Sequence, residues 1–157
     1  MMNEGRTSLE VENGFRQFDR GAEIIKYYLE PERPFALRIP VIVELQKEAV
    51  RDIQSDAGEL RRGEVHISGS IHSPPAAHLV SIHLGDFCDY INKNWHECSA
   101  FHLSAYEMWR LNWIHPFTDG NGQCLMFSSA FALVIYCRAP LLYRNRSRVT
   151  KLTTFMR

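Results

Sequence analysis

The chain lacks an excess of charge of either sign, because 18 lysines and arginines balance 18 aspartates and glutamates. A chain without net charge has no long-range field to recruit nucleic acid or an anionic membrane. Its four cysteines include no C-x-x-C pair, which excludes the usual zinc-knuckle and disulfide-framework patterns. No apolar run is long enough to span a bilayer, and the polar first 20 residues are unlike a signal peptide. We therefore expect a soluble, cytoplasmic protein that binds neither nucleic acid nor membrane, and the sequence leaves its oligomeric state open.

Internal repeats and low-complexity segments are also missing. The length of 157 residues suits one compact domain, and 45% hydrophobic with 23% charged residues is ordinary for a globular protein. We divide the chain into a short N-terminal segment, residues 1–14, and a domain over residues 15–157.

Apolar residues recur at helical spacing along most of the chain. A short helix is predicted over 7–13, with Thr7 or Ser8 as its cap and Gly14 as its end. Further helices are predicted over 15–29, 39–53, 77–92 and 100–113, and a strongly apolar one over 123–137. The residues predicted to face the core are Phe15, Phe18, Ala22, Ile25 and Leu29, then Ile42, Leu45, Ala49 and Ile53, then Leu79, Ile82, Phe87 and Ile91, and finally Leu103, Tyr106, Trp109 and Leu111.

One segment departs from the helical pattern. Residues 64–72 alternate between polar and apolar types around a central Ser-Gly pair, which predicts a short β-hairpin. The fold class is therefore all-α with one small β-hairpin. Four histidines lie in or near this segment, at spacings that match no helical pair of metal ligands: His66, His72, His78 and His83.

The most informative stretch is the loop His-Pro-Phe-Thr-Asp-Gly-Asn-Gly at residues 115–122. Its two glycines allow backbone N–H groups to converge into an anion-binding nest at the start of the next helix. Asp119 could hold a magnesium ion, His115 could accept a proton near neutral pH, and Phe117 is expected to anchor the loop in the core. Together these groups indicate phosphoryl or nucleotidyl transfer. Each residue taken alone is more typical of a capped turn between helices.

This string resembles the signature of the Fic (Fido) family, H-P-F-x-D/E-G-N-G-R-x-x-R, and matches its first eight positions. The resemblance extends over about residues 8–137 and implies a helical Fic core with a flap that binds the target by strand addition. It implies that His115 is the general base, that Asp119 is the Mg²⁺ ligand and that an anion hole forms at Gly120, Asn121 and Gly122. The implied flap residues are Val65, His66, Ile67, Ser68 and Gly69.

The two arginines of the family signature are absent, since Gln123 and Met126 stand at their positions. In the family these arginines hold the outer phosphates of the nucleotide. A hydrogen bond to a charged group contributes about 1.5–3 kcal/mol, so losing two weakens nucleotide binding or transfer by roughly two to four powers of ten. Gln123 could keep one neutral hydrogen bond to the nucleotide, whereas Met126 could keep none of comparable strength.

The N-terminal segment resembles the family's inhibitory pattern, S/T-x-x-x-E-G/N, at Ser8, Glu12 and Asn13. In the family the glutamate pairs with the second signature arginine and blocks the γ-phosphate. Here Met126 leaves Glu12 without that partner. The alternative for residues 8–13 is an ordinary capped helix with a solvated glutamate.

The resemblance implies an adenylyltransferase, a nucleotidyltransferase that uses ATP and Mg²⁺ to place AMP on a Ser, Thr or Tyr hydroxyl of a target protein. We expect autoinhibition and reduced activity. Two alternatives stay open: a Fic-fold binding module that has lost nucleotide transfer, and an enzyme that uses another phosphate-containing donor.

Overall fold

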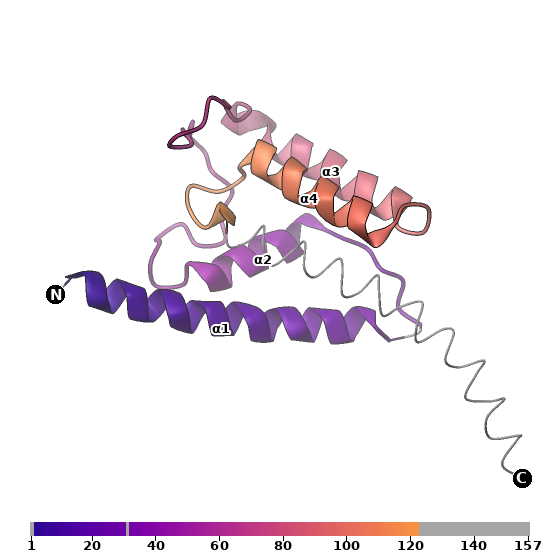
Figure 1. The fold of residues 1–157 in the computed structure, drawn as a ribbon, viewed down its shortest axis with the longest axis horizontal. Coiled ribbons are helices and arrows are strands. Elements are labelled where there is room, and N and C mark those ends of the chain that lie inside the picture. Colours follow the sequence, from indigo (N-terminus) through magenta and orange to yellow (C-terminus); the bar gives the residue numbers. More distant parts are fainter. Residues whose placement is uncertain (1, 31, 123–157) are drawn as a thin grey trace, which may run out of the picture.

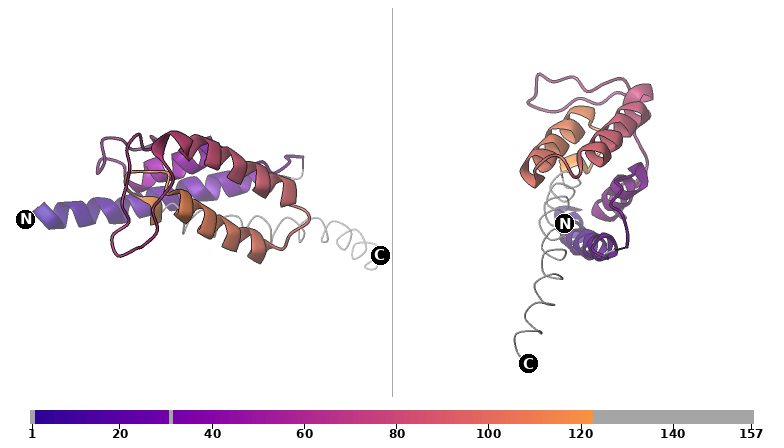
Figure 2. Two further views of the ribbon diagram at one scale, coloured as in Figure 1. Left: turned by 90° about the horizontal axis from the view of Figure 1, so that it is seen from above. Right: turned by 90° about the vertical axis from the view of Figure 1, so that its right-hand side faces the viewer.

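The computed structural model describes residues 2–30 and 32–122, and Figure 1 shows how their helices are arranged. α3 (Val80–Asn94) and α4 (Ala100–Ile114) form an antiparallel pair, and α2 (Ile39–Ala49) lies between this pair and α1 (Met2–Tyr28), as the two views in Figure 2 also show. In chain order the elements are α1, α2, the single 3-10 turn η1 (Ala77–Leu79), α3 and α4. The helical class predicted from the sequence is confirmed.

The core of the described residues lies where α2, α3 and α4 meet. It is apolar and centred on side chains that are almost fully buried, which is the arrangement that stabilises a helical domain most. Phe117, from the loop after α4, belongs to this core, as expected. The buried members are Ile24, Leu37, Ile42, Leu45, Val80, Leu84, Phe87, Cys88, Ile91, Trp95, Leu103, Leu111, Ile114 and Phe117.

α1 is one continuous helix, so the predicted end at Gly14 is wrong. A glycine inside a helix costs about 1 kcal/mol relative to alanine. Here buried side chains on either side of Gly14 hold the helix to α2 and to the turn that follows α2. Asn13 donates to the Arg51 carbonyl at 2.7 Å, and Gln17 donates to the Leu45 carbonyl at 3.0 Å. Such bonds offset the propensity of glycine, and the division at residue 14 therefore falls inside α1.

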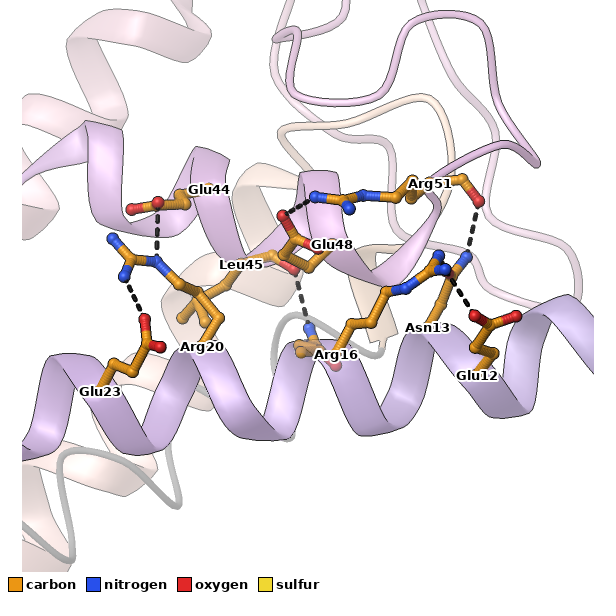
Figure 3. Close-up of polar contacts among 10 residues, drawn as sticks. Glu12, Asn13, Arg16, Arg20, Glu23, Glu44, Leu45, Glu48 and Arg51 are labelled. Carbon is orange, nitrogen blue, oxygen red and sulfur yellow. Dashed lines mark hydrogen bonds and ion pairs between the residues drawn. The ribbon is translucent and has the colours of Figure 1, made fainter.

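Around residues 13–18, the face of α1 that packs on the rest of the domain is polar, contrary to the prediction for Phe15 and Phe18, whereas Ile24 and Ile25 further along contact the apolar core. Asn13 and Gln17 are buried, whereas Phe15 and Phe18 are 68% and 60% exposed. Ion pairs flank this polar face: Arg20 bonds Glu44 of α2 at 2.8 Å and Glu23 of its own helix at 2.6 Å (Figure 3). These carboxylates raise the pKa of Arg20. Polar contacts therefore set the register of α1 on α2.

The remaining helices differ from prediction mainly at single positions. α2 ends at Ala49 rather than 53, because Val50 leaves the helical conformation and Asp52 adopts a positive φ of 59°. The 77–92 and 100–113 helices are confirmed, and the Ser99 hydroxyl caps α4 by accepting from the His102 N–H at 3.2 Å. Ile82 and Trp109, predicted to be buried, are each 58% exposed.

No strand occurs in residues 2–30 and 32–122, so the predicted hairpin at 64–72 is a loop. The turn itself is present: the Ser70 N–H donates to the Ile67 carbonyl at 3.1 Å, and Gly69 has a φ of +74°. Its two arms do not pair with each other. Contacts to the rest of the domain hold the arms instead, including the Ala77 N–H bond to the Glu64 carboxylate at 3.2 Å.

The apolar helix predicted over 123–137 lies outside the described residues, as do Gln123 and Met126. Of the helices that are described, none is both long enough and apolar enough to cross a membrane.

Candidate active site

His115 stands at the C-terminal end of α4, where the chain turns sharply. Its φ of 50° and ψ of 63° are left-handed, a conformation that few residues other than glycine adopt. Its N–H donates to the Leu111 carbonyl at 2.9 Å, which closes the last turn of the helix. The end of α4 therefore fixes the point from which the imidazole projects.

Asn121 folds the motif loop from within. Its side-chain NH₂ donates to the Phe117 carbonyl at 2.7 Å, and its side-chain oxygen accepts from the Phe117 N–H at 3.0 Å. Asn121 is 5% exposed, so this reciprocal pair is shielded from water. Because both polar groups of the Asn121 side chain bond Phe117, only the backbone N–H of Asn121 is available to bind an anion. Residues 121 and 122 are already helical.

Gly120 brings the loop against the end of α2. Its φ is +77°, and an added Cβ would lie 2.6 Å from Cγ1 of Val50. Gln46, buried in α2, donates to the Asp119 carbonyl at 3.1 Å and accepts from the Gly58 N–H at 2.8 Å. A side chain at position 120 would require a shift of Val50 or of the loop, and it would be strained by the positive φ.

The Asp119 carboxylate is half-exposed and already has partners. Its Oδ1 accepts from the Gly120 N–H at 2.7 Å, and its Oδ2 accepts from Gln54 Nε2 at 2.8 Å. Arg6 of α1 lies 3.6 Å away from the same Oδ2. The Gly120 N–H, one of the backbone donors predicted to bind an anion, therefore bonds Asp119, the predicted metal ligand.

The environment of His115 favours a neutral imidazole. Burial lowers its pKa, and the positive charges of Arg61 and His72 act in the same direction, whereas the Asn112 carbonyl acts against them. Nδ1 is buried and has no aligned hydrogen-bond partner among the described residues. A neutral imidazole is the form that can accept a proton.

His115 and the motif loop line a cleft of about 350 Å³, which α1 also borders. Arg6 and Glu10 of α1 line it, together with residues from the end of α2 and residues 118–122. A second hollow of about 480 Å³, formed by residues of the 47–57 region, contains no residue of the motif loop. The smaller cleft is therefore the candidate site.

Two of the predicted inhibitory residues, Ser8 and Glu12, do not line this cleft. Ser8 is exposed, and the Glu12 carboxylate bonds Arg16 at 2.5 Å, as Figure 3 shows. Each residue along a helix is turned by about 100° from the one before it. Glu10 and Glu12 are two residues apart and therefore point to nearly opposite sides of α1. The sequence pattern identified the helix that borders the cleft, but it did not identify Arg6 and Glu10.

The histidines near the loop at 64–72 have separate places. His72 bonds the Trp113 carbonyl through Nε2 at 2.9 Å, and the His83 ring packs edge-on against Trp113 at 5.2 Å between centroids. His66 and His78 are exposed. Among the described residues, no group of three or more His, Cys, Asp or Glu side chains could hold a metal ion. A cation at this site would therefore depend on Asp119 and a ligand for its coordination.

Comparison with known proteins agrees with the motif. The sequence model of the Fic/DOC family matches residues 36–133. The chain belongs to the Fic/DOC family. It is 28% identical over 120 residues to "Protein adenylyltransferase Fic" of Aedes aegypti, covering 74% of this chain and 23% of that relative. The relative of the same name from Drosophila willistoni is 28% identical over 109 residues, with 66% and 21% covered. The chain thus spans less than a quarter of the length of these curated relatives.

Solved structures of the family share the fold. A Fic domain containing signaling protein from Bacteroides thetaiotaomicron superposes with a TM-score of 0.68 at 24% identity, covering 82% of this chain and 50% of that one. A Fic family protein from Desulfovibrio desulfuricans gives 0.65 at 20% identity, with 86% and 43% covered. The covered share of 82–86% is larger than the family match, so the fold likeness reaches beyond residues 36–133.

Proposed function

We propose that this Fic domain transfers AMP from ATP to a Ser, Thr or Tyr hydroxyl of a target protein. The names of its curated relatives support the reaction class. The observation that carries the proposal is the prefolded motif loop, which brings His115, Asp119 and the backbone of residues 120–122 to one cleft.

In this reaction the hydroxyl oxygen of the target forms a bond to the α-phosphorus of ATP. The bond from that phosphorus to the bridging oxygen breaks, and pyrophosphate leaves with the electron pair. The proton of the hydroxyl goes to His115, whose lowered pKa keeps the ring neutral beforehand. Because Nδ1 is buried, Nε2 is the nitrogen available to accept it. A positioned base contributes about 10²–10⁴-fold to such a step.

Asp119 fits a magnesium ion that is shared with a nucleotide. Mg²⁺ is usually bound through one or two protein carboxylates plus substrate phosphates, and one half-exposed carboxylate at the cleft satisfies that pattern. Mg²⁺ would offset the negative charge of the phosphates. Asp119 must first exchange the Arg6 and Gln54 contacts on Oδ2, and its Oδ1 must release the Gly120 N–H for an anion.

The loop at 64–72 is the proposed binding place for the target. Its backbone around Val65 and Ile67 has no regular secondary structure and forms no ladder with the other described residues, so an extended target segment could pair with it by strand addition. The exposed residues His66, Ser68 and Gly69 surround the turn at its tip.

We further propose that α1 restrains the site. Arg6 and Glu10 border the cleft, and the Glu10 carboxylate would repel an entering triphosphate. The resemblance assigns the inhibitory role to Ser8 and Glu12 instead. All of these residues belong to α1.

The deciding experiment incubates the purified chain with Mg²⁺ and ATP labelled on the α-phosphate and measures label on protein. The chain is compared with its Gln123→Arg/Met126→Arg variant, and each is tested with and without His115→Ala. We expect weak labelling, stronger labelling after the arginines are restored, and loss of both with His115→Ala. His96→Ala, an exposed histidine between α3 and α4, is the matched control.

A second function is favoured by Gln123 and Met126, which stand where the family signature has arginines. A domain that lacks the two arginines for the outer phosphates could act as a binding module, or could use a donor with fewer outer phosphates. Absence of label in both backgrounds would contradict the adenylyltransferase proposal. Labelling from a nucleoside diphosphate derivative, but not from ATP, would support the other donor.

A further inference from the structure

Arg61 is the most extensively bonded buried cation that the described residues contain outside the cleft. It is 4% exposed, and within residues 2–30 and 32–122 its side chain donates to four backbone carbonyls and to no carboxylate. A buried guanidinium without a paired carboxylate is unusual, because burial disfavours an isolated charge. Burial lowers the pKa of Arg61, in line with this cost, and the negative charge of Glu64 acts in the opposite direction.

The carbonyls that Arg61 binds belong to three separate segments. Nε donates to the His115 carbonyl at 2.8 Å, one terminal nitrogen to Gly63 at 3.0 Å and the other to Pro75 at 2.5 Å. Gly63 and Pro75 are the two ends of the loop that carries the proposed target-binding residues. The planar guanidinium has donors in a fixed fork, so it joins these segments at set angles.

The main chain of Arg61 adds a further bond on the same side, since its N–H donates to the Pro116 carbonyl at 3.0 Å. A positive charge is also favourable at the C-terminal end of a helix, because the last carbonyls have no partner within the helix itself. Arg61 lies at this end of α4. Arg61 thus binds the carbonyl of His115, a residue in a left-handed conformation. His72 supplies a second connection from the loop to α4, through its bond to the Trp113 carbonyl.

We propose that Arg61 is a positioning residue that couples the placement of the His115 imidazole to the conformation of the 63–75 loop. Binding of a target segment to the loop shifts its two ends, and the guanidinium transmits this shift to the His115 main chain. This inference rests on the proposed function for its role in transfer, but the coupling itself is a property of the folded chain.

The test compares Arg61→Lys and Arg61→Ala with Arg62→Lys. Lysine keeps the charge and the stem but loses the fork. Arg62 is the matched control, because its side chain is 87% exposed and bonds only Glu59, at 2.9 Å, in the described structure. The full chain is labelled with ¹³C,¹⁵N-histidine, and the His115 ring signal is assigned by its loss in His115→Ala. Amide hydrogen exchange of residues 64–72 is measured in the same samples.

We expect Arg61→Lys to stay folded, to move the His115 ring signal and to speed amide exchange in the loop about tenfold or more, while Arg62→Lys changes neither. A purely structural role would lower the melting temperature and leave both signals in place, and that result would overturn the proposal. Loss of the fold in Arg61→Lys would also overturn it, since Arg61 would then be required for folding rather than for positioning. Arg61→Ala is expected to give the same changes, larger, if it folds.

The activity arm uses the Gln123→Arg/Met126→Arg background. Adding Arg61→Lys should lower kcat by about 10- to 100-fold, as misplaced catalytic groups do, with the KM for ATP unchanged. If that background transfers no nucleotide, the proposed function fails, but the His115 signal and the loop exchange still decide the coupling. If transfer is strong and Arg61→Lys leaves kcat unchanged, the coupling fails and the proposed function stands.

Discussion

Arg6 in the second turn of α1 lies 3.6 Å from the Asp119 carboxylate, measured from a terminal guanidinium nitrogen to Oδ2. Asp119 is more than a hundred residues away in sequence, and it is the residue that the motif assigns to the cation. A guanidinium from the N-terminal helix therefore lies next to the carboxylate oxygen that a divalent cation at Asp119 would need. Arg6 is also tied to Glu10 at 3.0 Å, so the two residues that border the cleft from α1 form one unit.

Arg6→Ala should strengthen the binding of a divalent cation at Asp119. The pair is about half exposed on both sides, with side-chain exposures of 54% and 49%, so the gain is limited to about fivefold. Mn²⁺ serves as the probe, with paramagnetic broadening of the amide signals of residues 118–122 as the measurement. Arg33→Ala is the control, since Arg33 pairs with Glu30 at 3.1 Å, outside the cleft. Equal Mn²⁺ affinity in wild type and Arg6→Ala would contradict this role for Arg6.

Gly120→Ala should destabilise the domain by about 1–3 kcal/mol, because the new methyl group meets Val50 Cγ1 at 2.6 Å in a backbone conformation that alanine avoids. The measurement is chemical denaturation followed by circular dichroism. Adding Val50→Ala removes the clashing methyl and should recover part of the loss, giving a non-additive pair.

The matched control for this substitution is Gly14→Ala. An added Cβ at Gly14 has no atom within 4 Å, and the residue lies inside the continuous α1. Alanine should therefore stabilise the helix by about 0.5–1 kcal/mol. A loss of stability at Gly14 comparable to that at Gly120 would show that the contact with Val50 is not the cause.

The two glycines illustrate what the sequence could and could not predict. The sequence predicted the loop, its buried Phe117 and the helix that precedes it, because these depend on local spacing. Gly14 predicts a helix end, because glycine is common just after the last residue of a helix. The helix continues because the buried amides of Asn13 and Gln17 bind the Arg51 carbonyl after α2 and the Leu45 carbonyl within it, and such tertiary contacts have no signature in local spacing.

Arg61 and the pair Arg6–Glu10 were missed for a related reason. In the sequence, Arg61 and Arg62 are adjacent and look alike, yet the first is 4% exposed and the second is at the surface. What distinguishes them is tertiary structure: Arg61 bonds the carbonyls of His115, Gly63 and Pro75, which local spacing does not bring together. Trp109 and Ile82 show the converse error, because apolar spacing marks a face without saying whether another element covers it.

The stability of the domain should fall with pH below neutrality through His115. Its folded-state pKa lies below the ordinary value of 6.5, mainly because of burial. As pH falls through 6.5, the unfolded chain takes up a proton that the folded chain refuses, so unfolding becomes more favourable. Below the folded pKa both states are protonated, and this contribution stops changing. The melting temperature measured between pH 8 and 5 should therefore drop less in His115→Gln than in wild type. His96→Gln, at an exposed site, should follow the wild-type curve.

The last prediction separates the two glutamates of α1. In the Gln123→Arg/Met126→Arg background, Glu10→Gln should lower the KM for ATP by about fivefold, because a carboxylate that borders the cleft repels phosphate with an energy near 1 kcal/mol in a solvated site. Glu12→Gln should change it less, because Glu12 does not line the cleft. Each carboxylate pairs with an arginine of α1, Glu10 with Arg6 at 3.0 Å and Glu12 with Arg16 at 2.5 Å, so pairing alone does not distinguish them. The two substitutions remove the same charge from the same helix, two residues apart, so each is the control for the other. Steady-state transfer of labelled AMP at varied ATP concentration gives both values. A larger effect at Glu12 would return the inhibitory role to the residue that the Ser8–Glu12 pattern indicates, because the restored arginine at position 126 would then have drawn that carboxylate toward the phosphates.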